Sequence, residues 1–296
     1  MFKPFFLFVI LGMVVGCSSQ KQVVTAGSTP QLLADTFRFT EGPAADAQGN
    51  VYFTDQPNNR IHKWNAADGR ITVFMEDAGR ANGLYFDKDG NLLAAADNQS
   101  ELWKIAPDKS VQVLLTDFKG KRFNGPNDLW IAPNGTIYFT DPYYQRDYWK
   151  RTHKDIEAER VYALTPDGAV RIVADDLVQP NGIIGTPDGK TLYVADIGAG
   201  KTYRYTLDSE GNLTNKHLFT EQGSDGMTLD RKGNVYLTGK GVTVYDTTGK
   251  QIEHINIDKD WTGNVTFGGK NRQTLFITAQ QGVYTLDMQV KGVRRY

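Results

Sequence analysis

A pattern of hydrophobic and polar positions recurs six times along this chain. Each copy is a short apolar stretch, then a turn rich in Asp, Gly, Asn or Lys, then a second stretch in which β-branched and aromatic residues alternate with others. This pattern is typical of a β-hairpin. The six copies occupy residues 40–55, 81–97, 126–141, 180–196, 224–239 and 263–279.

Further strand-like pairs lie between the copies, at 60–75, 101–115, 160–174 and 201–219. Four antiparallel strands per unit of roughly 40 to 54 residues are the signature of propeller blades around a central channel. The sequence therefore predicts an all-β fold, a six-bladed β-propeller of four-stranded antiparallel blades. We expect a strand within residues 23–39 to complete the last blade and leave no open edge. Only residues 153–160 have a helix-like pattern.

The N-terminal residues differ in character from the repeats. Lys3 precedes an apolar run from Phe5 to Val15, which is too short to span a bilayer and is typical of a signal peptide. The run ends at Cys17, the only cysteine of the chain, which is followed by Ser18. This arrangement resembles the lipobox of bacterial lipoproteins, in which cleavage leaves a lipidated N-terminal cysteine.

These features predict a lipoprotein signal peptide at 1–16, a tether at 17–30 after the lipidated Cys17, and a propeller at 31–296. Ser18 resembles a sorting signal for the outer membrane. We therefore expect a protein of the bacterial cell envelope, anchored to the periplasmic face of the outer membrane. The alternative is an ordinary signal peptide in which Cys17 is an incidental thiol. A single cysteine excludes intrachain disulfide bonds.

The charge balance restricts the partners. Lys and Arg number 33 against 34 Asp and Glu, a formal net charge of -1. No basic excess is available to neutralise a phosphate backbone, so nucleic acid is not an expected partner. We expect a monomer that binds a small molecule.

Each repeat opens on an acidic or amide residue, and equivalent positions in successive blades lie on a ring about the propeller axis. Six polar side chains should therefore converge. Buried carboxylates and amides need a partner, and a set made only of oxygen ligands suits Ca²⁺ better than Mg²⁺ or zinc. The alternative is that the Asn-Gly and Asp-Gly pairs at these points are only turn residues. The six openings are Glu41, Asn82, Asn127, Asn181, Asp225 and Asn264.

The same residues carry a family resemblance. The motifs are TEGP (40–43), RFNGPNDL (122–129), YFTDPYY (138–144), QPNG (179–182), SDGM (224–227) and NVTFGG (264–269). In order and spacing, over about residues 37–290, they resemble the gluconolactonase family that includes regucalcin and is related to paraoxonases and diisopropyl fluorophosphatase. The resemblance implies a catalytic divalent ion held by Glu41, Asn127, Asn181 and Asp225. It also implies that Arg122 and Asn124 lie beside the substrate.

Two segments bear on the substrate. Some members of the family carry His or Glu where this chain has Asp97 and Asn98, so the polar wall that faces the substrate differs. Residues 142–160 form the longest interval between repeats, and their aromatic and charged residues suggest a lid, a pocket wall or mere surface decoration. Tyr143 of this segment and Asn82 of the ring are candidate substrate contacts. Asn82 and Asn264 are otherwise expected as outer or channel residues.

The implied activity is that of a calcium-dependent hydrolase that opens a lactone, with the metal as Lewis acid. The chain has no Gly-x-Ser-x-Gly elbow and no histidine on the ring, so the general base should be a carboxylate. Asp225 is the first candidate and Glu41 the second. Three alternatives remain: a phosphotriesterase or arylesterase acting at the same site, a purely structural role for Asp225, and a lipid-anchored binding module without enzymatic activity.

Overall fold

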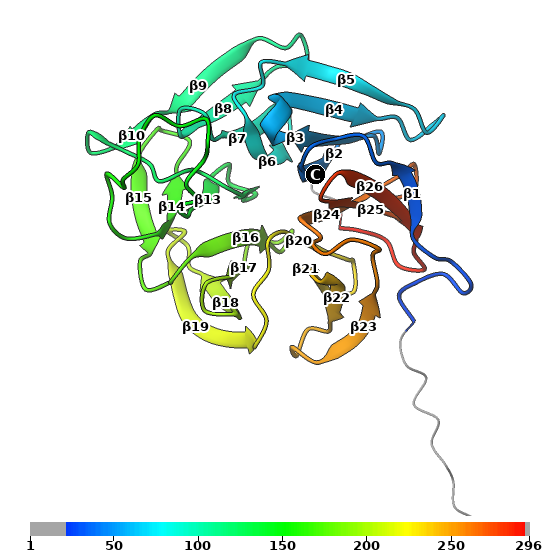
Figure 1. The fold of residues 1–296 in the computed structure, drawn as a ribbon. Coiled ribbons are helices and arrows are strands. Elements are labelled where there is room, and N and C mark those ends of the chain that lie inside the picture. Colours follow the sequence, from blue (N-terminus) through cyan, green and yellow to red (C-terminus); the bar gives the residue numbers. More distant parts are fainter. Residues whose placement is uncertain (1–21, 294–296) are drawn as a thin grey trace, which may run out of the picture.

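The computed structural model describes residues 22–293 and confirms the predicted architecture. Six four-stranded antiparallel sheets stand in a ring around a central axis (Figure 1). In blades 1 to 5 the strands follow one another in chain order across each sheet, the first strand lying innermost. The predicted signal peptide and the lipidation site Cys17 lie outside the described residues.

The strands of blades 1 to 3 are β2 (Thr40–Ala45), β3 (Val51–Asp55), β4 (Arg60–Trp64) and β5 (Ile71–Glu76); β6 (Ala81–Phe86), β7 (Leu92–Ala96), β8 (Glu101–Ile105) and β9 (Val111–Leu115); and β12 (Leu129–Ile131), β13 (Ile137–Asp141), β14 (Arg160–Leu164) and β15 (Val170–Ala174). A two-stranded hairpin, β10 (Asp117–Phe118) and β11 (Lys121–Arg122), precedes blade 3.

The strands of blades 4 to 6 are β16 (Pro180–Gly185), β17 (Thr191–Asp196), β18 (Lys201–Leu207) and β19 (Leu213–Thr220); β20 (Met227–Leu229), β21 (Val235–Gly239), β22 (Gly241–Tyr245) and β23 (Gln251–Ile255); and β24 (Asn264–Gly268), β25 (Thr274–Ala279), β26 (Gly282–Asp287) and β1 (Gln31–Ala34).

The N-terminal strand closes the ring as expected. β1 pairs antiparallel with β26, and Gln31 lies opposite Thr285. Upstream of β1, Val24 bridges to Met288 and Val23 is fully buried. The packed part of the chain therefore begins earlier than the predicted boundary at residue 31, because Val23 adds to the apolar core of blade 6.

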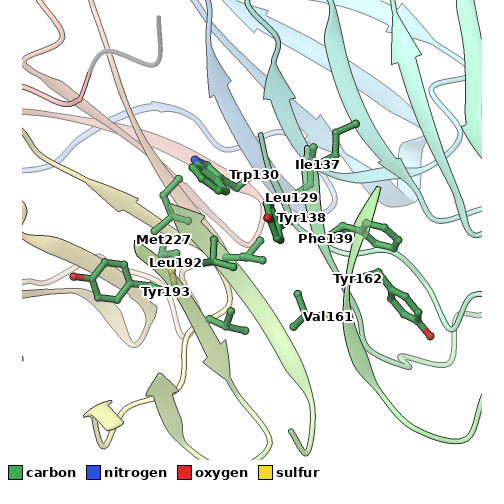
Figure 2. Close-up of a cluster of buried hydrophobic side chains, with 14 of the residues drawn as sticks. Leu129, Trp130, Ile137, Tyr138, Phe139, Val161, Tyr162, Leu192, Tyr193 and Met227 are labelled. Carbon is green, nitrogen blue, oxygen red and sulfur yellow. The ribbon is translucent and has the colours of Figure 1, made fainter. Parts of the chain in front are cut away.

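The core lies between blades. The two inner strands of a blade are buried along their length, as in β2 and β3, whereas the outermost strand is partly exposed, as in β5. Figure 2 shows the interlocking side chains where blades 3 and 4 meet. A Cβ atom on Gly185 would lie 2.3 Å from the ring of Trp130, so glycine at this position makes room for the indole.

Aspartates at the end of the second strand fix the loops that enter three blades. Each carboxylate accepts hydrogen bonds from two successive backbone amides: Asp55 from residues 38 and 39, Asp141 from 124 and 125, and Asp196 from 178 and 179. In blade 2 the equivalent position is occupied by Ala96, which pairs with the first residue of the third strand as Asp55, Asp141 and Asp196 do. The next residue, Asp97, begins the turn, and its carboxylate accepts hydrogen bonds from side chains of the segment 142–160.

The helix predicted at 153–160 is wrong. Residues 153–159 form bends and loop, Arg160 begins β14, and the described residues contain a single helix, the short 3-10 turn η1 (Gln56–Asn58). A stretch of eight residues is too short to be helical without tertiary support. Here tertiary contacts favour another path, because Ile156 enters the core and Lys154 pairs with Glu159. Within residues 22–293 no helix has the length and apolar character to cross a membrane.

Candidate functional site on the propeller axis

Five of the six residues that open the repeats line one cavity of about 250 Å³ on the axis. It lies where the innermost strands begin, which we call the cavity end of the propeller; the opposite end, with hairpin turns such as 46–50, is the turn end. The five are Glu41, Asn82, Asn127, Asn181 and Asp225, and the wall is completed by Phe39, Tyr144, Arg146, Ile197 and Trp261. A larger cavity of about 540 Å³ at the turn end, between blades 1 and 2, contains none of the ring residues.

Glycines next to the ring residues allow the inner strands to crowd together. A Cβ atom on Gly42 would lie 2.0 Å from the carbonyl oxygen of Asn82, and one on Gly226 would lie 1.9 Å from the side chain of Asn264. Glu41-Gly42, Asn82-Gly83 and Asn181-Gly182 lie inside strands rather than in turns. The alternative that such pairs only form turns is therefore wrong for these copies.

Two buried carboxylates face each other in the cavity. Burial raises the pKa of Glu41 well above its usual range, and the charge of Asp225 raises that pKa further. Burial also raises the pKa of Asp225, against the opposing effect of its hydrogen bonds. The indole Nε1 of Trp261 donates to Oδ2 of Asp225 at 2.6 Å, and Nδ2 of Asn181 donates to Oδ1 at 2.9 Å. Such a pair needs a proton or a cation to balance its charge.

The cavity residue Asn181 has one unpaired acceptor among the described residues. Its Nδ2 donates to the hydroxyl of Tyr144 as well as to Asp225, both at 2.9 Å. Its Oδ1 is buried without a hydrogen-bond partner among the described residues. Buried polar atoms of this kind call for an explanation, and a bound cation is one that the surrounding oxygens support.

The donor set fits a hard divalent cation. Within residues 22–293 no three side chains of His, Cys, Asp or Glu gather as a metal cluster. The candidate ligands are instead two carboxylates and two amides: Glu41, Asp225, Asn127 and Asn181. Oxygen ligands of mixed charge and flexible geometry suit Ca²⁺, whose remaining positions are usually filled by water or substrate.

Sequence reasoning missed Asp128, which lies next to the ring residue Asn127 but does not line the main cavity. Its carboxylate is buried, and burial raises its pKa to about 7. Asp128 and Asn264 line a small space next to the main cavity, so Asn264 lies deeper than the other five ring residues. The signal was present in the sequence: Asp128 follows Asn127 at the position where four of the six repeats have glycine.

The predicted substrate contacts are distributed differently. Asn82 lines the cavity. Arg122 is exposed on the hairpin strand β11, and the Nδ2 of Asn124 donates to the backbone carbonyls of Asp141 and Ala158. Tyr143 donates its hydroxyl to Gln145. Arg122, Asn124 and Tyr143 therefore lie outside the cavity wall.

Residues 142–160 supply part of that wall, so they are more than surface decoration. Tyr144 and Arg146 line the cavity. The segment is fastened to blade 2, because Trp149 donates its indole Nε1 to the carbonyl of Asp97 at 2.9 Å. It is also fastened to the loop before blade 3, because Arg151 donates to the carbonyl of Phe123 at 2.9 Å.

Fold and cavity together define a class: six-bladed propellers with an oxygen-rich cavity on the axis. Residues 39–281 match the SMP-30/Gluconolactonase/LRE-like region, which covers most of the chain. The chain belongs to this family.

Individual relatives agree with this family assignment. A gluconolactonase from Zymomonas mobilis is 30% identical over 95% of this chain and 88% of its own length. The structure of a gluconolactonase from Xanthomonas campestris, 29% identical, superposes with a TM-score of 0.83 over 90% of this chain and 91% of that one. A regucalcin structure from Agrobacterium tumefaciens, described as a calcium-binding protein, shares the fold with a TM-score of 0.75 at 23% identity, over 90% of this chain and 96% of that one. A diisopropyl-fluorophosphatase from Loligo vulgaris is 25% identical over 86% of this chain and 91% of its own length.

Proposed function

We propose that the protein is a calcium-dependent hydrolase that opens a lactone, of the gluconolactonase kind. One observation carries the proposal: Glu41 and Asp225 face each other in a buried cavity beside an amide oxygen of Asn181 that has no partner among the described residues. A cation would balance this pair and bind that oxygen. The gluconolactonases among the relatives support lactone as the substrate class.

Glu41, Asn127, Asn181 and Asp225 would hold the ion, which supplies Lewis-acid polarisation of the lactone carbonyl. Asp225 is the general base. Each of its carboxylate oxygens accepts one hydrogen bond within the protein and keeps a further acceptor position. It takes a proton from the attacking water, and that proton then passes to the ring oxygen as the carbon–oxygen bond breaks, which yields a hydroxy acid.

Hydrogen bonds preorganise this base. Trp261 and Asn181 hold the two oxygens of Asp225 in place, so little rearrangement is needed when the proton moves. Phe39, Ile197 and Trp261 form the apolar part of the wall and limit the water that reaches the site.

A phosphotriester or another activated ester is the second candidate substrate, favoured by the diisopropyl-fluorophosphatase among the relatives. The same carboxylates and amides would serve it. Turnover of glucono-δ-lactone, acyl lactones and paraoxon-type esters, followed with a pH indicator or by absorbance, separates the two substrate classes.

The test of the proposal joins metal analysis to two variants. The purified protein should contain calcium or gain thermal stability from it. Asp225→Asn should lower kcat on the preferred lactone by about 10²–10⁴-fold, because it removes the base, and Asn181→Ala should weaken calcium binding. Asp176→Asn is the matched control, because this exposed carboxylate pairs with Lys216 and does not line the cavity. If both site variants keep every hydrolytic activity and the calcium stabilisation of the wild type, the proposal is wrong and a binding module without enzymatic activity takes its place.

We also propose that the mature chain is a monomer anchored in the cell envelope through Cys17. The lipobox-like sequence before Cys17 supports the anchor. Labelled palmitate should be incorporated by the wild type and not by Cys17→Ala, and only the wild type should sediment with membranes. Light scattering of the detergent-solubilised protein gives the oligomeric state.

A further inference from the structure

The cavity wall contains one cationic side chain, that of Arg146. Its Nε donates to Oδ2 of Asp97 at 3.2 Å, and its side chain keeps 22% of its surface exposed. Within residues 22–293 no acceptor receives a hydrogen bond from its two Nη groups. A guanidinium fixed through Nε and with Nη donors to spare is suited to bind oxygen atoms of a ligand.

Asp97, which holds this guanidinium, begins the turn between β7 and β8. Its carboxylate accepts hydrogen bonds from the side chains of Arg146 and Tyr148. Asp97 is 2% exposed, so the pair with Arg146 is largely removed from solvent. The indole of Trp149 donates to the carbonyl of the same residue and anchors the segment behind Arg146.

Other groups near the site are already engaged or point elsewhere. Arg151 donates to the carbonyls of Phe123 and Asn124 and to the hydroxyl of Ser100. Arg122 is exposed on its hairpin and does not line the cavity. Arg146 is therefore the cation that a molecule in this cavity would meet.

The charges of the cavity indicate which ligand oxygens Arg146 would bind. Asp97 balances the guanidinium, and the carboxylates of Glu41 and Asp225 line the same space. An additional anionic group on the substrate would meet this acidic wall. Neutral hydroxyl groups would instead accept from the Nη groups and donate to amide oxygens such as that of Asn82.

We propose that Arg146 is the substrate-binding cation of this site, that it recognises the hydroxyl oxygens of a polyhydroxylated lactone, and that Asp97 is its positioning residue. The inference rests on the proposed lactonase function. It assigns the specificity for a hydroxylated ring to the segment 142–160, while the ring residues act on the ester group that all lactones share.

The first test compares glucono-δ-lactone with δ-valerolactone, which has the same ring without hydroxyl groups. Arg146→Gln should lower kcat/KM for glucono-δ-lactone about 10–100-fold, the effect of losing hydrogen bonds from a charged group. Its kcat/KM for δ-valerolactone should fall much less, so the ratio of kcat/KM for the two lactones should change about 10-fold or more. Arg60→Gln is the matched control, because Arg60 pairs with Glu76 on the exposed edge of blade 1. Equal losses on both lactones, or no loss on either, would overturn the inference.

Asp97 is tested through the split between KM and kcat. Asp97→Asn should raise KM for glucono-δ-lactone and leave kcat on δ-valerolactone unchanged, and Asp97→Glu should restore part of the KM. Asp55→Asn removes another buried carboxylate, one that binds backbone amides of blade 1, and should lower the melting temperature without changing the ratio of kcat/KM for the two lactones. If Asp55→Asn and Asp97→Asn change that ratio alike, Asp97 has only a structural role.

A binding measurement separates this inference from the proposed function. Glucono-δ-lactam keeps the hydroxyl groups and replaces the ester by an amide that resists hydrolysis. In calorimetry with calcium present, the wild type should bind the lactam and Arg146→Gln should bind it at least about 10-fold more weakly. A wild type that binds the lactam but hydrolyses neither lactone refutes the proposed function and leaves recognition by Arg146 standing. Equal binding by both proteins, or no binding by the wild type, refutes recognition by Arg146.

Discussion

The indole of Trp261 donates a hydrogen bond of 2.6 Å to Oδ2 of Asp225. Trp261 lies in the loop that leads into blade 6, whereas Asp225 precedes the first strand of blade 5. The orientation of the proposed base thus depends on a neighbouring blade, and the contact lowers the pKa of the Asp225 carboxyl against the effect of burial.

Replacing Trp261 by Phe should weaken catalysis without unfolding the protein. The variant keeps an aromatic ring and loses the N–H donor. We expect kcat/KM on the preferred lactone to fall about 10-fold or more, because a hydrogen bond to a charged group is lost. Steady-state kinetics and a melting curve check this. A variant as active as the wild type would show that the indole is not needed to orient Asp225.

Tyr144→Phe should weaken calcium binding. The hydroxyl of Tyr144 is one of two acceptors for Nδ2 of Asn181, and together with Asp225 it fixes the orientation of this amide. Loss of one neutral hydrogen bond should raise the Kd for calcium about 2–10-fold. Calorimetric titration of the metal-free protein measures it. Tyr143→Phe is the control, since that hydroxyl contacts Gln145 outside the cavity.

The metal-free protein should be more stable in mild acid than in mild alkali. Burial raises the pKa of both Asp128 and Asp141 to about 7, so the folded protein holds protons that the unfolded chain would release. This stabilisation is present at low pH and is lost as the pH rises through about 7. Melting temperatures after chelation should therefore fall between pH 5 and pH 8. A melting temperature that rises over this interval would contradict the prediction.

The stabilisation of the fold by calcium should be largest at the alkaline end of the same range, pH 5 to pH 8. Burial and the charge of Asp225 raise the pKa of Glu41, so the ionised pair destabilises the metal-free fold. Added calcium should raise the melting temperature more at pH 8 than at pH 5. Glu41→Gln should raise the stability of the metal-free protein and abolish the response to calcium, and retention of that response would exclude Glu41 as a ligand.

Gly226→Ala should lower the free energy of unfolding more than Gly182→Ala does. A Cβ atom on Gly226 would meet the side chain of Asn264 at 1.9 Å, whereas one on Gly182 would meet its nearest neighbour, the carbonyl of Asp225, at 2.9 Å. Overpacking of this kind typically costs about 1–3 kcal/mol, and Gly226→Ala should lie at the upper end. Chemical denaturation of both variants checks the order, and the reverse order would mean that Asn264 yields easily.

The fold could be predicted because its information is local and repeated. Each hairpin carries its own alternation and turn residues, and ring geometry then fixes where the first residue of each copy must lie. The repeat pattern is therefore sufficient to bring Glu41, Asn127, Asn181 and Asp225 together at one end of the axis, where all four line the cavity.

The remainder of the wall could not be predicted, because it comes from segments without a repeat. Trp261 lies in a loop. Tyr144 lines the cavity, whereas the predicted Tyr143, one position earlier, contacts Gln145 outside it. Arg146 lies in the cavity wall and is held by Asp97, which is distant in sequence. Asp128 was recognisable as the departure from glycine in its repeat.

The pairing of Val24 with Met288 also orients the molecule. The carbonyl of Val23 accepts a hydrogen bond from the amide of Gln289, next to the turn that joins β24 and β25. The described chain therefore enters the propeller at its turn end, opposite the cavity. With Cys17 lipidated, about five residues, or roughly 17 Å when extended, separate the acyl chains from Val23. The bilayer would then face the hairpin turns, the cavity mouth would open toward the aqueous compartment, and dissolved substrates would reach it without passing the lipid headgroups.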